Sequence, residues 1–175
     1  GWVALRLAAR PDLPITGVVP VGPAGIRMAP LFFTIDRLPG VAQVIGMPAP
    51  VPAGVLRSIV AGLYRTLAYA DAAAIDPAVV ERFVRFNLDR ATLRERINYA
   101  KRMRADLADP FDAKAIQAPV HAIWGELDRL CPVAGAAELS ELLPDARVEV
   151  IRGVGHTPQI EATEAVVAAI TDLSR

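Results

Sequence analysis

The residue with the clearest potential for chemistry is His156, in the segment Gly-Val-Gly-His-Thr-Pro. The segment follows an apolar run over residues 147–151, typical of a strand, and precedes a predicted helix over 161–173. Catalytic side chains in open α/β sheets lie on such loops, where a strand ends and a helix begins. The two glycines of the segment allow backbone angles that other residues resist. Thr157 is predicted to cap the following helix and Pro158 to open it.

A second candidate is Asp128, which follows an apolar run over residues 119–124 and therefore also lies just past a predicted strand. A carboxylate that accepts a hydrogen bond from one imidazole nitrogen fixes the histidine tautomer and stabilises the imidazolium. Asp128 and His156 are therefore predicted to be the acid and the base of a catalytic triad, which still requires a nucleophile.

Other residues with comparable chemistry have simpler interpretations. Glu126 is the rival carboxylate and is expected to face solvent, whereas His121 lies inside an apolar strand and is expected to pack in the core. A nucleophilic Cys131 would need a base within reach and a lowered pKa, and its position beside Pro132 favours a small apolar loop residue instead. None of the three serines stands in a Gly-x-Ser-x-Gly turn or follows a strand: Ser58, Ser140 and Ser174.

Two motifs, in their order and spacing, resemble those of the α/β-hydrolase family. They are Trp-Gly-Glu-Leu-Asp over residues 124–128 with Pro132, and Gly-His-Thr-Pro over residues 155–158 with Glu161. The triad of that family runs Ser, then Asp or Glu, then His along the chain, and Asp128 before His156 agrees with this order. The resemblance implies a hydrolase that uses no metal and no organic cofactor. Leu130 and Thr157 are predicted to contact the substrate.

The resemblance also implies that the nucleophile lies upstream of these 175 residues. Residues 1–10 resemble the family's helix directly after the nucleophile elbow, in which Gly-x-Ser-x-Gly is often followed by another glycine and an aromatic or small residue. Gly1 would then be the last glycine of the elbow or the next one along. The family's oxyanion donors, which include the amide just after the nucleophile, would lie upstream as well.

The pattern of the whole chain predicts an α/β fold with a parallel sheet and flanking helices, and the resemblance implies that this is an incomplete α/β-hydrolase fold with a helical cap insert. Residues 1–27 and 114–175 alternate between helix and strand, and a strand over 15–22 is weakened by Pro20. Residues 28–113 break this alternation. They are predicted to form the cap, since the resembled family carries its cap between the same two strands.

Three helices are predicted within this cap insert, over residues 55–70, from Pro77 onward, and over 91–107. Asp76 is predicted to cap the second helix. The apolar stripe of that helix is predicted to be Val79, Val80, Phe83 and Phe86. Large apolar residues of the insert predict an apolar substrate pocket: Leu31, Phe32, Phe33, Met47, Leu63 and Leu67.

Composition narrows the partners. Basic and acidic residues balance at 19 each, which does not favour a nucleic acid or an anionic membrane as partner. No apolar run approaches the ~18 residues that a membrane span needs. A single cysteine excludes an internal disulfide and is compatible with the cytoplasm, which is the predicted location.

The predicted function is hydrolysis of a carboxylic ester or a related small apolar substrate by a Ser-Asp-His triad. The nucleophile stays open, because relatives with an upstream Asp open epoxides or displace halide, and other relatives cleave carbon–carbon bonds. A different class of hypothesis is a non-catalytic module or an inactive truncated remnant. A first helix without its cap and a sheet of about three strands favour truncation over a binding module.

Overall fold

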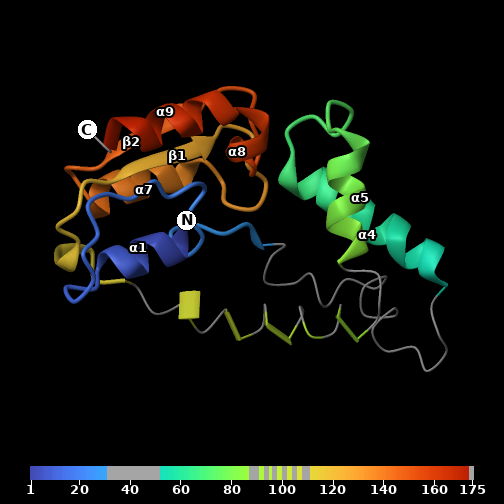
Figure 1. Ribbon diagram of the computed structural model, residues 1–175, viewed down its shortest axis with the longest axis horizontal. Coiled ribbons are helices and arrows are strands. Elements are labelled where there is room, and N and C mark those ends of the chain that lie inside the picture. The colour runs from blue at the N-terminus through green and yellow to red at the C-terminus, as the bar shows by residue number, and fades with distance from the viewer. Residues whose placement is uncertain are drawn as a thin grey trace.

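The computed structural model describes residues 1–30, 52–86 and 111–173, together with nine residues between 91 and 107. The described elements form an α/β part and a pair of helices beside it (Figure 1). The α/β part consists of α1 (Trp2–Ala8), β1 (His121–Gly125), α7 (Ala134–Leu142), β2 (Arg147–Ile151), α8 (Pro158–Glu161) and α9 (Thr163–Leu173). The helix pair is α4 (Ala53–Ala68) and α5 (Pro77–Arg85), and a short 3-10 helix, Ala113–Ala115, precedes β1.

The sheet is parallel, as the alternation of predicted strands and helices indicates. β1 and β2 pair along their full length, with His121 opposite Arg147 and Gly125 opposite Ile151. All five residues of β1 are buried, which is typical of a parallel strand covered on both faces. Parallel pairing puts the loops that follow β1 and β2 at the same edge of the sheet.

The strand predicted over residues 15–22 is present only as two isolated parallel bridges: Val18 with Val120, and Val21 with Ile123. Pro20 explains the interruption. The amide of Val18 donates to the carbonyl oxygen of Pro119 at 3.0 Å, and the amide of Gly22 donates to that of Ile123 at 2.9 Å. An amide at position 20 would donate between them, but proline has no N–H, so the ladder loses its middle bond.

Helices cover both faces of the sheet (Figure 1). Trp124 points toward α1 and α7, where Leu5 and Leu139 are fully buried with it. Ile123, the preceding residue of β1, points to the opposite face and packs on Val166 of α9. The alternation of side chains along β1 therefore fixes a helix–sheet–helix arrangement around the strand.

The helix pair has an apolar cluster of its own: Leu56, Val60, Ala61, Val80 and Val84. α5 begins as predicted, because the Asp76 carboxylate accepts a hydrogen bond from the amide of Ala78 at 2.8 Å and Pro77 is the first helical residue. The apolar stripe predicted for this helix is wrong in part.

Val80 and Val84 are the buried residues of α5, whereas Phe83 and Phe86 are 39% and 65% exposed. Positions 80 and 84 lie one helical turn apart, on the face that contacts α4. Phe86 is the C-terminal cap of this helix and lies two residues after Val84, a spacing that puts it on a different face. Phe83 instead stacks on Tyr64 of α4, with ring centroids 3.7 Å apart.

Parts of the predicted cap insert lie outside the described residues. The nine described residues between 91 and 107 are all helical, in agreement with the helix predicted there. The residues that define its predicted period are among those outside: Leu93, Ile97, Ala100 and Arg104. The same holds for four of the predicted pocket residues: Leu31, Phe32, Phe33 and Met47.

The single helix predicted at the C-terminal end is two helices, α8 and α9, separated at Ala162. Pro158 opens α8 as predicted. Thr157 is the N-cap residue of α8, as predicted, but its side chain makes no capping hydrogen bond to the helix backbone. Its hydroxyl lies instead 3.1 Å from the carbonyl oxygen of Ala68 and 3.1 Å from the carboxylate of Glu161.

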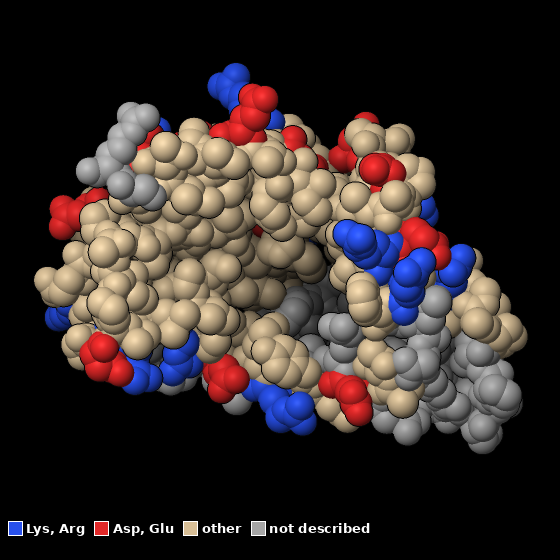
Figure 2. All heavy atoms as spheres, viewed as in Figure 1, with Lys and Arg blue, Asp and Glu red and all other residues tan. Residues whose placement is uncertain are grey.

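Basic and acidic side chains lie beside one another over α4 and α5 on the face shown in Figure 2. Arg57 and Glu81, for example, form an ion pair at 2.9 Å. This mixture matches the balanced charge of the sequence. None of the described helices has the length and apolar character that a membrane crossing requires.

Candidate active site

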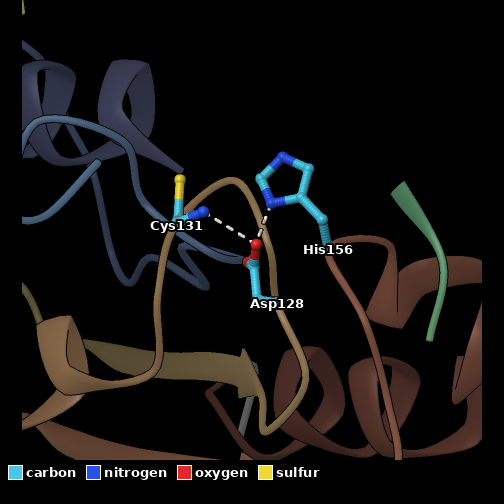
Figure 3. Close-up of side chains that lie close together, drawn as sticks. All are labelled: Asp128, Cys131 and His156. Carbon is cyan, nitrogen blue, oxygen red and sulfur yellow. Dashed lines mark hydrogen bonds and ion pairs between the residues drawn. The ribbon is translucent and has the colours of Figure 1, made fainter. Parts of the chain in front are cut away.

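Asp128 and His156 meet at the carboxyl edge of the sheet (Figure 3). The distance between Asp128 Oδ2 and His156 Nδ1 is 2.8 Å. Asp128 follows β1 and His156 follows β2, so the parallel pairing of the two strands brings their loops together. An ionised carboxylate only accepts hydrogen bonds, so in the neutral imidazole Nδ1 carries the proton and Nε2 has the lone pair.

The Asp128 carboxylate is fully enclosed, with no exposed side-chain surface. Its second oxygen, Oδ1, accepts hydrogen bonds from the amides of Leu130 at 2.8 Å and Cys131 at 2.7 Å. Three donors therefore compensate its burial and fix the direction in which Oδ2 faces. The loop after β1 is built to hold this carboxylate.

The imidazole of His156 is accessible from outside, with 29% of its side chain exposed. The second ring nitrogen points away from Asp128 (Figure 3), and no hydrogen bond from it to the described residues is observed. A neutral imidazole held in this way can take a proton at Nε2 while the carboxylate stabilises the resulting positive charge.

The two glycines before His156, Gly153 and Gly155, are required for different reasons. Gly153 has φ of 69°, in the left-handed region that favours glycine. Gly155 does not have a positive φ, and its requirement is space. A Cβ atom there would lie 2.5 Å from the amide nitrogen of Ala70 and 2.7 Å from the carbonyl carbon of Tyr69. The loop thus rests directly on the backbone that follows α4.

Gly22 is part of the site but was not predicted from the sequence. It has φ of 44°, and a Cβ atom on it would lie 3.0 Å from Asp128 Oδ2 and 3.3 Å from His156 Nδ1. Gly1 packs against the next residue of the same turn, since a Cβ atom on Gly1 would lie 2.5 Å from the Pro23 Cα. The start of α1, this turn and the Asp–His pair are therefore stacked together. The sequence feature that could have indicated this role is the Gly22–Pro23 pair at the end of a predicted strand.

Cys131 is 1% exposed and lies beside Met28, with 3.5 Å between the two sulfur atoms. Burial, and then the charge of Asp128, raise the pKa of this thiol to about 12. A neutral thiol is a poor nucleophile, in agreement with its interpretation as a small loop residue. Potential ligand atoms of Asp128, Cys131 and His156 lie within 4.8 Å of one another. A metal would need the thiolate and a free carboxylate oxygen, so the donors do not fit a metal site.

The remaining polar candidates lie where the sequence interpretation put them. Glu126 is exposed, and its carboxylate accepts a hydrogen bond from the amide of Gly153 at 3.0 Å. His121 is buried within β1, 3.2 Å from the carboxylate of Glu149. Two serines donate to carbonyls of their own helices, and the third lies outside the described residues: Ser58, Ser140 and Ser174.

The backbone at the end of α4 is tied to both loops of the site, which the sequence did not indicate. Arg129, next to Asp128, donates from its guanidinium to the carbonyl oxygen of Thr66 at 2.7 Å. The amide of His156 donates to the carbonyl oxygen of Ala68 at 2.9 Å. The helix pair and the Asp–His pair are thus joined by direct hydrogen bonds.

A small apolar pocket of about 240 Å³ lies between α4, α5 and the Asp128 loop. Its lining includes Leu63, Leu67 and Phe83 of the helices and Leu130 of the loop. Thr157 does not line this pocket, because its hydroxyl is engaged inside the His156 loop. Of the two residues predicted to contact substrate, only Leu130 faces this space.

Comparison with protein-family models gives no match, and comparison with curated protein sequences gives none either. Solved structures do match, among them a meta-cleavage product hydrolase from Pseudomonas fluorescens (TM-score 0.70, 20% identity). Others are an enol-lactonase from Burkholderia xenovorans (0.68, 20%) and a thermophilic esterase from Thermogutta terrifontis (0.64, 17%). The matches cover 98%, 97% and 98% of this chain. The chain has the α/β-hydrolase fold.

The matches cover nearly all of this chain but only part of each solved structure. The chain spans about 60% of the length of each of these three structures. The parallel sheet and its covering helices thus represent part of an α/β-hydrolase fold, as predicted. At these identities the likeness establishes the α/β-hydrolase fold, and the chemistry has to be argued from the residues of the site.

Proposed function

We propose that this chain carries the acid and the base of a hydrolase triad, with Asp128 as the acid and His156 as the base. The observation that carries the proposal is the 2.8 Å bond between Asp128 Oδ2 and His156 Nδ1, with the carboxylate enclosed and the imidazole accessible. The substrate we propose is a carboxylic ester or a related small apolar molecule, and the reaction uses no metal and no organic cofactor.

In the proposed reaction, His156 Nε2 takes the hydroxyl proton of a serine as the serine oxygen attacks the ester carbonyl carbon. The imidazolium then gives this proton to the departing alkoxide, which leaves an acyl-enzyme. Water reacts with the acyl-enzyme in the same way, so the acid is released and the serine regains its proton. Asp128 holds the tautomer and stabilises the imidazolium in both halves of the cycle.

The serine is proposed to precede Gly1 in the complete protein. Two features support this position. Gly1 packs on the Gly22–Pro23 turn, and Gly22 in turn contacts Asp128 and His156, so a residue shortly before Gly1 would lie near the pair. No strand among the described residues pairs with the free edge of residues 18–21, where a preceding strand would fit.

The region over residues 28–113 is proposed to be the cap that shapes the substrate pocket. α4 and α5 belong to this region, and their side chains form most of the apolar pocket beside the Asp128 loop. A wall of aliphatic and aromatic groups favours an uncharged acyl or alkyl group. We propose that Leu130 contacts this group directly, whereas Thr157 acts beneath it by holding the His156 loop.

The test compares residues 1–175 with the same chain extended upstream through the nucleophile and the oxyanion donors. We expect the extended protein to hydrolyse p-nitrophenyl esters and to react with a fluorophosphonate probe, and His156→Ala to abolish turnover. The short chain is expected to be inactive, because each oxyanion donor contributes on the order of 3 kcal/mol and the nucleophile is missing.

Three other outcomes have distinct meanings. Turnover of epoxides or haloalkanes without fluorophosphonate labelling would indicate an upstream Asp nucleophile. Cleavage of a carbon–carbon bond would indicate that the protein is a C–C bond hydrolase instead of an esterase. Turnover by the short chain that depends on His156 would require a nucleophile within it, with Cys131 tested first by Cys131→Ala. A folded extended protein without any of these activities would support an inactive remnant or a non-catalytic module.

A further inference from the structure

Glu161 is the last residue of α8, and both oxygens of its carboxylate accept hydrogen bonds from the loop that carries His156. Its Oε2 accepts a hydrogen bond from the amide of Gly155 at 3.0 Å and lies 3.1 Å from the Thr157 hydroxyl. Its Oε1 accepts from the amide of Ala70 at 2.9 Å and, more weakly, from Gly155 at 3.2 Å. The carboxylate therefore binds the residue before His156, the residue after it and the backbone beyond α4.

The other side of the loop is held by Ala68. Its carbonyl oxygen accepts from the His156 amide at 2.9 Å and lies 3.1 Å from the Thr157 hydroxyl. A hydroxyl has one proton, so Thr157 donates to either Ala68 or Glu161 at a given moment. The amides of Gly155 and His156 and the Thr157 hydroxyl are thus engaged, with Glu161 on one side and the end of α4 on the other.

The site leaves little freedom for this loop to move against α4. The absent Cβ of Gly155 would lie 2.5 Å from the same Ala70 nitrogen that donates to Glu161. The Asp128 loop is fixed to the same stretch of backbone, because Arg129 donates to the carbonyl oxygens of Thr66 at 2.7 Å and Tyr69 at 3.3 Å. The loops that carry Asp128 and His156 are therefore both held by hydrogen bonds to one segment of backbone, residues 66–70.

We infer that Glu161 is a positioning residue: it keeps the His156 imidazole aligned with Asp128 by joining residues 155 and 157 to the backbone at Ala70. The catalytic meaning of this role rests on the proposed function, whereas the alignment itself does not. A carboxylate is suited to the role because it supplies several acceptor sites to several donors, and charge-assisted bonds of this kind are the stronger ones.

The decisive measurement is NMR of the two histidines in protein labelled with 15N-histidine. His156 Nδ1–H, bonded to Asp128, is expected to give a slowly exchanging downfield proton in the unsubstituted protein. Glu161→Ala is expected to abolish that signal while the ring signals of His121 stay unchanged, which shows that the fold is retained. Glu161→Gln is expected to keep a weakened signal, because the amide oxygen can still accept from Gly155. Glu164→Ala, three residues further along on α9, is the control and should change nothing.

A protein that unfolds at lower temperature but keeps the His156 signal after Glu161→Ala would overturn the inference, since Glu161 would then be structural only. If Glu161→Ala does not fold, Glu161→Gln and Thr157→Val carry the test, and an unchanged His156 signal in both would overturn it. In the extended protein, kcat for an ester should fall roughly 10²-fold in Glu161→Ala with little change in KM. An extended protein without esterase activity would defeat the proposed function and leave the NMR result valid.

Discussion

The chain holds two histidine–carboxylate pairs, one within the sheet, where its strands begin, and one at the carboxyl edge of the sheet. Within the sheet, the side chain of His121, the first residue of β1, is 4% exposed and bonds through Nε2 to Glu149 of β2, which is 37% exposed. At the edge, His156 is 29% exposed and bonds through Nδ1 to Asp128, which is fully enclosed. The distribution of burial between the two partners is reversed.

This reversal separates a pair that stabilises the fold from a pair that can do chemistry. In the sheet, the imidazole is enclosed and its carboxylate reaches solvent, so no substrate can approach the ring. At the edge, the carboxylate is fixed by backbone amides, and the free ring nitrogen faces outward. Residue types alone do not distinguish the pairs; the position of each along its strand does.

The largest expected effect is on catalysis by the edge pair. In the extended protein, Asp128→Asn should lower kcat for an ester about 10⁴-fold, because an amide can donate to Nδ1 and so favour the wrong tautomer. Steady-state kinetics on a p-nitrophenyl ester measure the change. Glu149→Gln makes the same chemical change in the sheet pair and should leave kcat unchanged. A comparable loss from both substitutions would remove the distinction between the pairs.

The order should reverse when stability is measured instead of activity. His121→Ala removes an enclosed ring from the start of β1 and should lower the free energy of unfolding by about 2 kcal/mol. His156→Ala should cost about 1 kcal/mol, since water can reach the vacated side of Asp128. Urea unfolding followed by circular dichroism gives both values. An equal or larger cost for His156→Ala would mean that the edge pair is mainly structural.

A residue of the site could be predicted from the sequence where its role is marked by its immediate neighbours along the chain. Asp128 and His156 each lie in a motif that marks the end of a strand, so a parallel sheet alone was enough to predict that they meet. Glu161 was recognised as part of its motif but not for what it binds. Arg129 and Gly22 were missed, because their roles depend on partners far along the chain, such as Thr66, which is 63 residues from Arg129.

The same reasoning explains the errors in the fold. The apolar stripe of α5 was misread because helical spacing identifies several apolar residues but not the face that meets α4, which buries Val84. Thr157 was predicted as a helix cap from its place before Pro158. Its hydroxyl is drawn instead to Ala68 and Glu161, and the Ala68 contact joins residues 89 positions apart. Local patterns place elements well, whereas the contacts that align the site are set by tertiary packing.

The smallest expected effect concerns Cys131, the thiol beside the edge pair. Its pKa is raised to about 12, from 9.0 in the unfolded chain, because burial and the Asp128 charge both disfavour the thiolate. The unfolded chain therefore loses this proton at lower pH than the folded protein, and the thiol favours folding only while it stays protonated in both. That contribution is complete below pH 9 and is lost as pH rises toward 12.

The free energy of unfolding of the unsubstituted protein, minus that of Cys131→Ala, should fall by about 1 kcal/mol between pH 8 and pH 10. Tyr69, whose pKa burial also raises, is present in both proteins and cancels in this difference. A difference that stays constant with pH would show that the folded thiol ionises normally. Above pH 9 the site would then contain a thiolate close to His156, and Cys131 would return as a candidate nucleophile.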